Sequence, residues 1–312
     1  MIARPSGAPE GGLMRVVVTG GTGFIGREVV ARLLEEGGVD VAVTTRHPER
    51  ADPWEGRVRK VQAFAGDTVS LGKAFTGADT VVHAIQFPNH PVEDAAKGRT
   101  YMEVDGRGTQ MAVEVARKLG VRRFVYMSGA GAGRGLPQPW FKAKDLAEAA
   151  IRESGMEYGI LRPSWIYGPG DHSMNRFIWF CRHLPVVPVI GDGLTPVYPA
   201  YVKDVARAVV DLVRREDARS AVLEIGGPQR LTMDQVIRTV QEVLGRRRPL
   251  LHHPPGLMKL LVKPMAILPT PMLSPGAVDF ITQTVEIDTR PAMDYFGFPF
   301  RSLRAGLDEY VA

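Results

Sequence analysis

The chain has 312 residues, of which 45% are hydrophobic, and a formal net charge of +5 from 39 basic and 34 acidic side chains. This length predicts one large domain with a smaller one appended, and it excludes a small scaffold held together by disulfides. The basic residues are spread along the chain, apart from Arg246 to Arg248, so we do not expect nucleic acid as a partner. The only cysteine, Cys181, lies in an apolar run, which indicates a buried thiol and a reducing cytoplasmic location.

Residues 1–13 contain proline, glycine and serine but no apolar segment of the kind found in signal peptides. Such a composition cannot build a core, so we expect a disordered extension that ends just before Met14. No hydrophobic stretch reaches the length of a transmembrane helix.

The stretch from Arg15 to Arg32 is predicted to form an apolar strand, a glycine-rich turn and a helix. Three glycines stand three residues apart, where missing side chains permit a tight bend and close approach of the backbone to a pyrophosphate. The following helix would direct free N–H groups and the positive end of its dipole at the phosphates. A purely structural turn is the alternative, but the strand–turn–helix context favours a dinucleotide site. We expect cofactor contacts from Gly20, Gly23, Phe24, Ile25 and Gly26.

A second apolar strand, Val39 to Thr45, ends in Arg46. An NAD-specific site usually has an acid here to hold the ribose 2′-hydroxyl, whereas an arginine can pair with a 2′-phosphate. Because Arg46 and the nearby Arg50 replace that acid, we expect a preference for NADP(H), with NAD(H) as the second choice. Two solvated arginines are the alternative interpretation.

The chain then alternates strands with helices. Strands are expected at residues 57–64, 78–84, 123–128 and 156–161, and helices at 67–75 and 102–119. Asp67 begins a helix, where it is either an N-cap or a cofactor contact. Ala84 and Ile85 follow a strand and would lie under the cofactor, and Ser128 ends the next strand at the same edge. His83 is more typical of a packed histidine than of a catalyst.

This alternation predicts an α/β fold, a doubly wound parallel sheet covered on both faces, with ligands at the carboxyl ends of the strands. Beyond Gly168 the pattern loosens, as expected of a substrate domain inserted in pieces. The nucleotide domain is expected at residues 14–168 and 195–225, and a smaller, mostly helical substrate domain at 169–194 and 226–312.

The chain resembles an extended, atypical member of the short-chain dehydrogenase/reductase superfamily, which has a Rossmann-type fold. The motifs are TGGTGFIG at Thr19, VVHA at Val81, DGRGT at Asp105, RFVYMS at Arg123, LRPSWIYGPGD at Leu161 and YPAYVKDVA at Tyr198. The later motifs GGPQRLT, LGRRRPLL and LSPGAVDFITQ are similar to the group that includes the NAD(P)H-binding accessory subunit of respiratory complex I. The resemblance implies nicotinamide contacts from Pro163 and Ser164.

The family's catalytic set is a serine, a tyrosine and a lysine, the last two four residues apart on one helix face. Ser128 matches the serine and Lys144 the lysine, but Trp140 occupies the tyrosine position. An indole N–H only donates and does not titrate near neutral pH, so Trp140 cannot shuttle a proton as a phenol can. Ordinary ketone reduction can therefore be lost while cofactor binding survives. The remaining tyrosines considered as substitutes are Tyr126, Tyr158 and Tyr167.

Two classes of function remain. The first is an NADP-dependent oxidoreductase for an apolar carbonyl, enone or quinone, in which Ser128 polarises the substrate oxygen, Lys144 holds the ribose, and water or another side chain supplies the proton. The second is a non-catalytic NADPH-binding protein that senses redox state or stabilises a respiratory complex. A nucleotide-sugar epimerase or dehydratase is weaker, because those relatives depend on the missing tyrosine.

Three further segments have two interpretations each. The loop Gly129 to Pro139 either covers the nicotinamide or is a surface linker. The apolar run Phe177 to Phe180 either lines a lipid or quinone pocket or, as we favour, is core. Gly256 to Leu268, interrupted only by two lysines, is too short to span a bilayer, and either lies on a membrane or, as we favour, forms a buried cap on the substrate site. His252 and His253 have no further ligand at metal-binding spacing, so no metal is expected.

Overall fold

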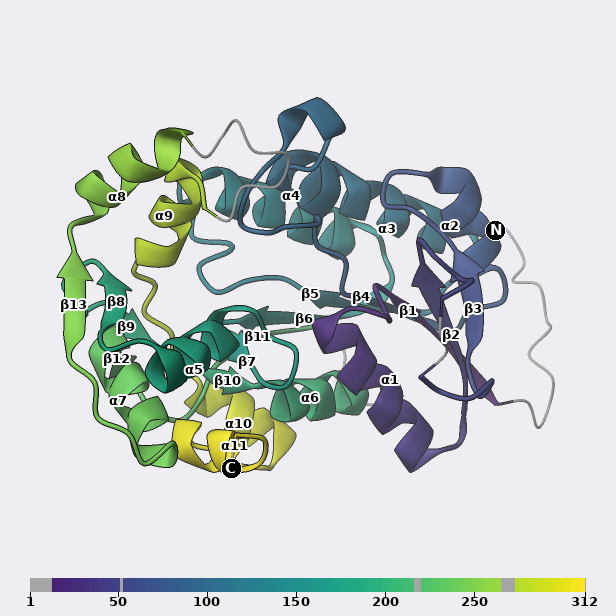
Figure 1. Ribbon diagram of the computed structural model, residues 1–312. Helices are drawn as coiled ribbons and strands as arrows, with labels where there is room; N and C mark the ends of the chain where they lie inside the picture. Colours follow the sequence, from purple (N-terminus) through teal and green to yellow (C-terminus); the bar gives the residue numbers. More distant parts are fainter. Residues whose placement is uncertain (1–12, 51–52, 216–219, 265–272, 312) are drawn as a thin grey trace.

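The computed structural model describes residues 13–50, 53–215, 220–264 and 273–311 of the chain (Figure 1). Its centre is a seven-stranded sheet in the order β11-β6-β5-β4-β1-β2-β3, and every neighbouring pair is parallel. The strands are β1 (Met14–Thr19), β2 (Val39–Thr45), β3 (Arg59–Gln62), β4 (Thr80–His83), β5 (Arg123–Met127), β6 (Glu157–Pro163) and β11 (Ala221–Ile225). The strand order reverses between β1 and β4, where a doubly wound sheet binds its ligand. The predicted α/β class is confirmed.

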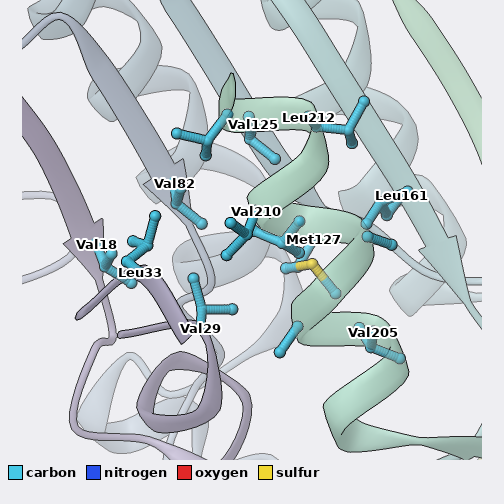
Figure 2. Packing of buried hydrophobic residues seen from close by; sticks show 14 of the residues in the cluster. Val18, Val29, Leu33, Val82, Val125, Met127, Leu161, Val205, Val210 and Leu212 are labelled. Carbon is cyan, nitrogen blue, oxygen red and sulfur yellow. The ribbon is translucent and has the colours of Figure 1, made fainter. Parts of the chain in front are cut away.

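Helices cover both faces of the sheet, because successive strand residues point to opposite sides. Val16 and Val18 pack toward one layer of helices, and Val17 packs toward the other. The first layer is α1 (Phe24–Glu36), α6 (Val202–Arg214) and α10 (Arg290–Phe296); the second is α2 (Thr68–Phe75), α3 (Gly108–Lys118) and α4 (Pro139–Glu153). Figure 2 shows α1 and α6 packing their valines and leucines against Val82, Val125 and Leu161 of the sheet.

Two predicted elements differ in the structure. The third strand covers four residues, because β2 pairs with it only from Ala42 to Thr45 and then ends. The predicted helix at 102–119 begins with a wider, π-helical turn, η2 (Tyr101–Arg107), before α3. Added side chains would be crowded in this turn, since a Cβ on Gly106 would lie 3.3 Å from Leu146. The wide turn leaves Asp105 fully buried, and π-helical turns occur often at functional sites.

Most of the remaining elements form a second core beside the carboxyl edge of the sheet. The helices of this core are α5 (Ser173–His183), α7 (Met233–Val243) and α11 (Leu303–Asp308). Its strand pairs are β7 (Ile166–Tyr167) with β10 (Ala200–Tyr201), β8 (Val187–Ile190) with β13 (Leu250–His253), and β9 (Pro196–Val197) with β12 (Leu231–Thr232). Two further helices, α8 (Pro255–Val262) and α9 (Pro275–Thr282), pack against each other, and Phe280 of α9 packs against the cluster that contains Trp140. Phe296, Phe298 and Phe300 instead join the core on the first face of the sheet. The exact domain division stays a prediction.

The structure also bears on the predictions for Cys181, for the run Phe177 to Phe180 and for membrane-spanning helices. Cys181 is fully buried, as predicted, and burial raises the pKa of its thiol to about 11. In the run Phe177 to Phe180, Ile178 is core while Trp179 is 51% exposed and stacks on His183. The predicted disordered extension falls outside the described residues, except for Leu13. Within the described ranges, no helix has the length and apolar composition that a bilayer span requires.

Candidate cofactor and catalytic site

The glycine turn between β1 and α1 has the geometry of a phosphate cradle. Gly20 has a φ of +69°, and a Cβ there would lie 2.7 Å from the carbonyl oxygen of Ala84. A Cβ on Gly26 would overlap the carbonyl oxygen of Gly20, and the Gly23 N–H donates to that same oxygen at 2.9 Å. The turn therefore requires glycine on steric grounds, and it lies against the backbone of Ala84 and Ile85, whose cofactor contacts stay a prediction.

The N-terminus of α1 is the part of the turn that can receive an anion. Gly23 is the N-cap, and no side chain caps the helix. The first N–H groups of a helix lack partners within the helix, so they are available to a phosphate, and the helix dipole adds a positive potential. Phe24 and Ile25 are the first helical residues, as predicted. These residues fit the pyrophosphate of a dinucleotide.

The residues predicted to contact the adenosine half lie along the neighbouring strands. Arg46 directly follows β2 and is exposed, and so is Arg50. Asp67 caps α2 by accepting a hydrogen bond from the Val69 N–H at 3.0 Å. Its hydrogen bonds with Ser70 hold the pKa of the Asp67 carboxyl below its usual value. The capping role of Asp67 is thus observed, and a cofactor contact from it or from Arg46 stays a prediction.

Lys144 of α4 is buried beside the ends of β4 and β5. Its Nζ lies 3.1 Å from Asp105 Oδ1 and 3.3 Å from the Met127 carbonyl oxygen, and 5.2 Å from the centre of the Tyr126 ring. Burial alone would lower the pKa of Lys144, but Tyr126 and Asp105 outweigh burial and raise it. Lys144 is therefore charged at neutral pH.

Ser128 is held by a buried ion-pair network. Its Oγ donates to Glu148 Oε1 at 2.7 Å, and Glu148 also accepts hydrogen bonds from Arg162 at 2.6 Å and Arg152 at 2.7 Å. Burial would raise the pKa of Glu148, but these hydrogen bonds keep it lowered, so Glu148 is a carboxylate. The hydroxyl hydrogen of Ser128 is thus already donated. To polarise a substrate oxygen, the Ser128 hydroxyl must turn away from Glu148.

Trp140 connects α4 to the C-terminal segment. Its indole N–H donates to Gln283 Oε1 at 2.6 Å, and its ring packs against Tyr101, Phe141 and Phe280. A cavity of about 640 Å³ adjoins it, lined among others by Pro91, Tyr101, Gln138, Trp140, Asp279 and Gln283. Trp140 is 8% exposed, so it forms one wall of this cavity while its only donor holds Gln283.

The other tyrosines considered as proton donors are held within the cores. Tyr126 is fully buried next to Lys144, and burial raises its pKa. Tyr167 is also buried, and its hydroxyl donates to the carbonyl oxygen of Leu303 at 3.2 Å. Tyr158 is a partly buried member of the core beneath α4. All three lie on strands and none belongs to α4, the helix that carries Lys144.

His83 is a packed histidine, as the sequence indicates. Its ring nitrogens lie 2.9 Å from Thr19 Oγ1 and 3.2 Å from Thr109 Oγ1. Burial, together with the charge of Lys144, lowers its pKa to about 3, so the ring is neutral. On β13, His252 lies 2.9 Å from Asp234, a partner that the sequence spacing does not reveal. Among the described residues, no group of three metal-ligand side chains gathers there or elsewhere.

The loop from Gly129 to Pro139 is held to the rest of the structure by hydrogen bonds and an ion pair. The Gly133 N–H donates to Asp145, and Arg134 pairs with Glu224 and donates to the Glu286 carbonyl oxygen at 2.7 Å. The backbone at the predicted nicotinamide contacts is likewise engaged. Pro163 accepts from the Ala130 N–H and the Ser164 N–H donates to Ile225, both at 2.8 Å.

Sequence reasoning missed the residues that hold Ser128 and Lys144 in place. Asp105 and Glu148 are the buried carboxylates beneath Lys144 and Ser128, and Arg162 neutralises the second. A signal existed for Glu148, because it stands four residues after Lys144 on the same helix and so shares its face. For Asp105 the corresponding signal is weak, because its inward direction depends on the π-helical turn.

Comparisons with known proteins identify the family of the chain. A family described as NAD(P)H-binding matches residues 20–178. Mitochondrial NADH dehydrogenase (ubiquinone) 1 alpha subcomplex subunit 9 of Arabidopsis thaliana is 26% identical over 238 residues, which are 73% of this chain and 57% of that protein. Ceramide reductase of Caulobacter vibrioides is 27% identical over 249 residues, 78% of this chain and 75% of that protein. The chain thus spans little more than half of the plant subunit.

A solved structure shows the same architecture over nearly the whole length. MoeE5 in complex with UDP-glucuronic acid and NAD superposes with a TM-score of 0.72 at 27% identity, covering 94% of this chain and 96% of that one. The glycine turn, the parallel sheet and the family match lead to one assignment. The chain belongs to the NAD(P)H-binding family and is an atypical, extended short-chain dehydrogenase/reductase.

Proposed function

We propose that this chain is an NADP(H)-dependent oxidoreductase that acts on an apolar carbonyl compound, an enone or a quinone. The observation that carries the proposal is the charged, buried Lys144 at the cofactor edge of the sheet, together with the uncapped α1 N-terminus. A bound reduced nicotinamide would supply a hydride, and Lys144 would hold its ribose. The similarity to a ceramide reductase supports an apolar substrate.

The groups around the cavity favour a hydride acceptor whose reduction does not require a proton donor from the protein. A simple ketone requires a proton at its oxygen as the hydride arrives. Trp140 does not titrate near neutral pH, and the Ser128 hydroxyl is engaged by Glu148. An enone or a quinone spreads the negative charge over a conjugated system, so water can supply the proton. We therefore expect these acceptors to be reduced faster than simple ketones.

The preference for NADPH rests on Arg46 and Arg50, which are both exposed beyond β2. A guanidinium can form paired, charge-assisted hydrogen bonds with a 2′-phosphate, and an unphosphorylated ribose offers it no such partner. A cytoplasmic location also stays our prediction, based on the single cysteine.

A second candidate is a non-catalytic NADPH-binding protein that senses redox state or stabilises a respiratory complex. The observation in its favour is that both donors at the proton-transfer positions hold other side chains, Trp140 through Gln283 and Ser128 through Glu148. Similarity to a subunit of NADH dehydrogenase supports the same candidate.

Paired titrations of the purified protein with NADPH and NADH, followed by nicotinamide fluorescence, test the cofactor proposal. We expect micromolar binding of NADPH and weaker binding of NADH. Arg46→Ala should weaken NADPH binding about tenfold and leave NADH unchanged, because only the 2′-phosphate contact is lost. Arg117→Ala, an exposed arginine on α3, is the matched control and should alter neither affinity.

Turnover then separates the two candidates. The NADPH-bound protein is assayed with simple ketones, enones and quinones, and reduction of the conjugated acceptors supports the oxidoreductase. NADPH binding without turnover of any acceptor would move the conclusion to the non-catalytic protein. Failure to bind either nucleotide would exclude both.

A further inference from the structure

The outer face of α8 is exposed and strongly apolar. Leu257, Leu260 and Leu261 are 46%, 62% and 59% exposed. Their spacing of three and four residues places them on one side of the helix. Exposed leucines are ordinary singly, but three on one face form a patch that water solvates poorly. We propose that this leucine face of α8 docks the protein onto a lipid surface that contains anionic headgroups.

The opposite side of α8 is anchored in the fold. Val262 is 4% exposed, and Lys259 forms an ion pair with Asp279 of α9. Figure 1 places α8 at the periphery of the molecule, with α9 beside it and α4 beyond. The helix is thus held by its inner face, and Leu257, Leu260 and Leu261 remain available for a partner.

The charge around α8 identifies the kind of partner. From Val243 to Val278 the chain contains no aspartate or glutamate; Arg246, Arg247 and Arg248 precede β13, and the basic residues of α8 itself are Lys259 and its C-terminal neighbour Lys263. Lys263, at the C-terminal end of α8, is exposed. An apolar helix face with an exposed lysine at its end is the pattern that binds anionic membrane surfaces, and Asp279, the acid of α9 that contacts α8, is paired with Lys259.

A second copy of the chain fits this surface less well. Two copies that pack their α8 faces about a two-fold axis present the same patch to each other. Such packing would bring Lys263 of both copies together, and Asp279, the acid of α9 next to α8, is already paired with Lys259, so the two Lys263 side chains would repel each other. A lipid surface instead supplies the missing negative charge together with an apolar layer for the leucines.

Docking would also place the cavity near lipid. Gly276, Asp279 and Gln283 line the cavity beside Trp140, and the first two belong to α9, which packs against α8. An apolar acceptor dissolved in the membrane would then enter close to the site. This consequence rests on the proposed reductase function, whereas docking itself does not.

Vesicle flotation with the purified full chain tests the docking proposal. We expect the chain to float with vesicles of phosphatidylcholine and phosphatidylglycerol, and to bind pure phosphatidylcholine vesicles more weakly. The triple variant Leu257→Ser/Leu260→Ser/Leu261→Ser should lose binding by about tenfold or more, because its apolar face is gone. Lys263→Glu should weaken binding to the anionic vesicles only.

The matched control changes three exposed apolar residues far from α8. Val69→Ser/Met111→Ser/Leu119→Ser removes apolar side chains that are 67%, 36% and 43% exposed on or next to α2 and α3, and it should bind vesicles like the parent. NADPH titration of both triple variants should match the parent, which separates docking from the cofactor site.

Three outcomes would overturn the docking proposal. The first is that the parent chain floats with neither kind of vesicle. The second is that the α8 triple variant floats as well as the parent. The third is a concentration-dependent dimer in sedimentation velocity that only the α8 variant abolishes, which would assign the leucine face to self-association.

Discussion

The glycine turn and the contact between Trp140 and Gln283 are stabilised by different kinds of interaction. The turn depends on backbone contacts among residues a few positions apart, such as the Gly23 N–H on the Gly20 carbonyl oxygen. The contact between Trp140 and Gln283 joins side chains that are 143 positions apart in the sequence. The first kind of site can be recognised in a sequence, and the second requires the fold.

The largest effect is expected from Gly26→Ala, which tests whether the turn depends on its local backbone contacts. The added Cβ would overlap the Gly20 carbonyl oxygen and lie 2.8 Å from the Gly21 Cα, and both obstacles are backbone. We expect a loss of about 4 kcal/mol in the free energy of unfolding, and no measurable NADPH binding, because helix and turn must separate. Chemical denaturation and the NADPH titration measure the two effects.

Gly72→Ala is the control for that substitution. Gly72 lies inside α2, and a Cβ there would meet nothing within 4 Å. Alanine is a better helix former, so we expect a gain of about 0.5 to 1 kcal/mol in stability and unchanged NADPH affinity. Equal behaviour of the two alanine variants would contradict the steric account of the turn.

The next largest effect is expected from Lys144→Met, which leaves Asp105 buried without its cation. Removing one partner of a buried pair costs about 3 kcal/mol. The double variant Asp105→Asn/Lys144→Met should recover most of that loss, because no buried charge remains. Denaturation of the parent, both single variants and the double variant completes the cycle. Independent, additive losses would show that Asp105 and Lys144 do not act as a pair.

The same pair predicts a dependence on pH. Burial raises the pKa of Asp105, and the charge of Lys144 opposes that rise. In Lys144→Met the opposition is gone, so the folded state binds a proton more tightly than the unfolded state does. Its stability relative to the parent should therefore improve as pH falls toward the usual carboxyl range, and be lost as pH rises through the raised pKa of Asp105. A deficit that is constant with pH would argue against a buried charge at Asp105.

The extent of sequence-based prediction follows from the same difference between local and distant contacts. The parallel sheet and its two helix layers were predictable, because strands that are apolar throughout, such as the one containing Val16, Val17 and Val18, alternate with helices along the chain. The substitution at Trp140 was also visible, since it depends only on four-residue spacing from Lys144. The contact with Gln283 was not, because no local pattern tells which distant segment will meet an indole N–H.

The tryptophan at the tyrosine position is tested by Trp140→Tyr. A phenol four residues before Lys144 would lie beside a positive charge that lowers its pKa, so we expect ketone reduction to rise about tenfold. NADPH affinity should change little. Trp140→Phe is the control, because it keeps an aromatic ring and supplies no hydroxyl, and it should give no gain. A loss of NADPH affinity in Trp140→Tyr without any gain in turnover would place Trp140 in the nucleotide pocket instead.

The smallest effect is expected from Ser128→Ala. Glu148 keeps its hydrogen bonds from Arg162 and Arg152 when the hydroxyl is removed, so the loss of stability should be about 1 kcal/mol. If Ser128 also polarises the substrate, turnover of a conjugated acceptor should fall about fivefold at unchanged NADPH affinity, and Ser128→Thr should restore it. A loss of stability without any change in turnover would assign Ser128 wholly to the Glu148 network. The Ser128 position would then serve, like that of Trp140, to hold the fold around the cofactor.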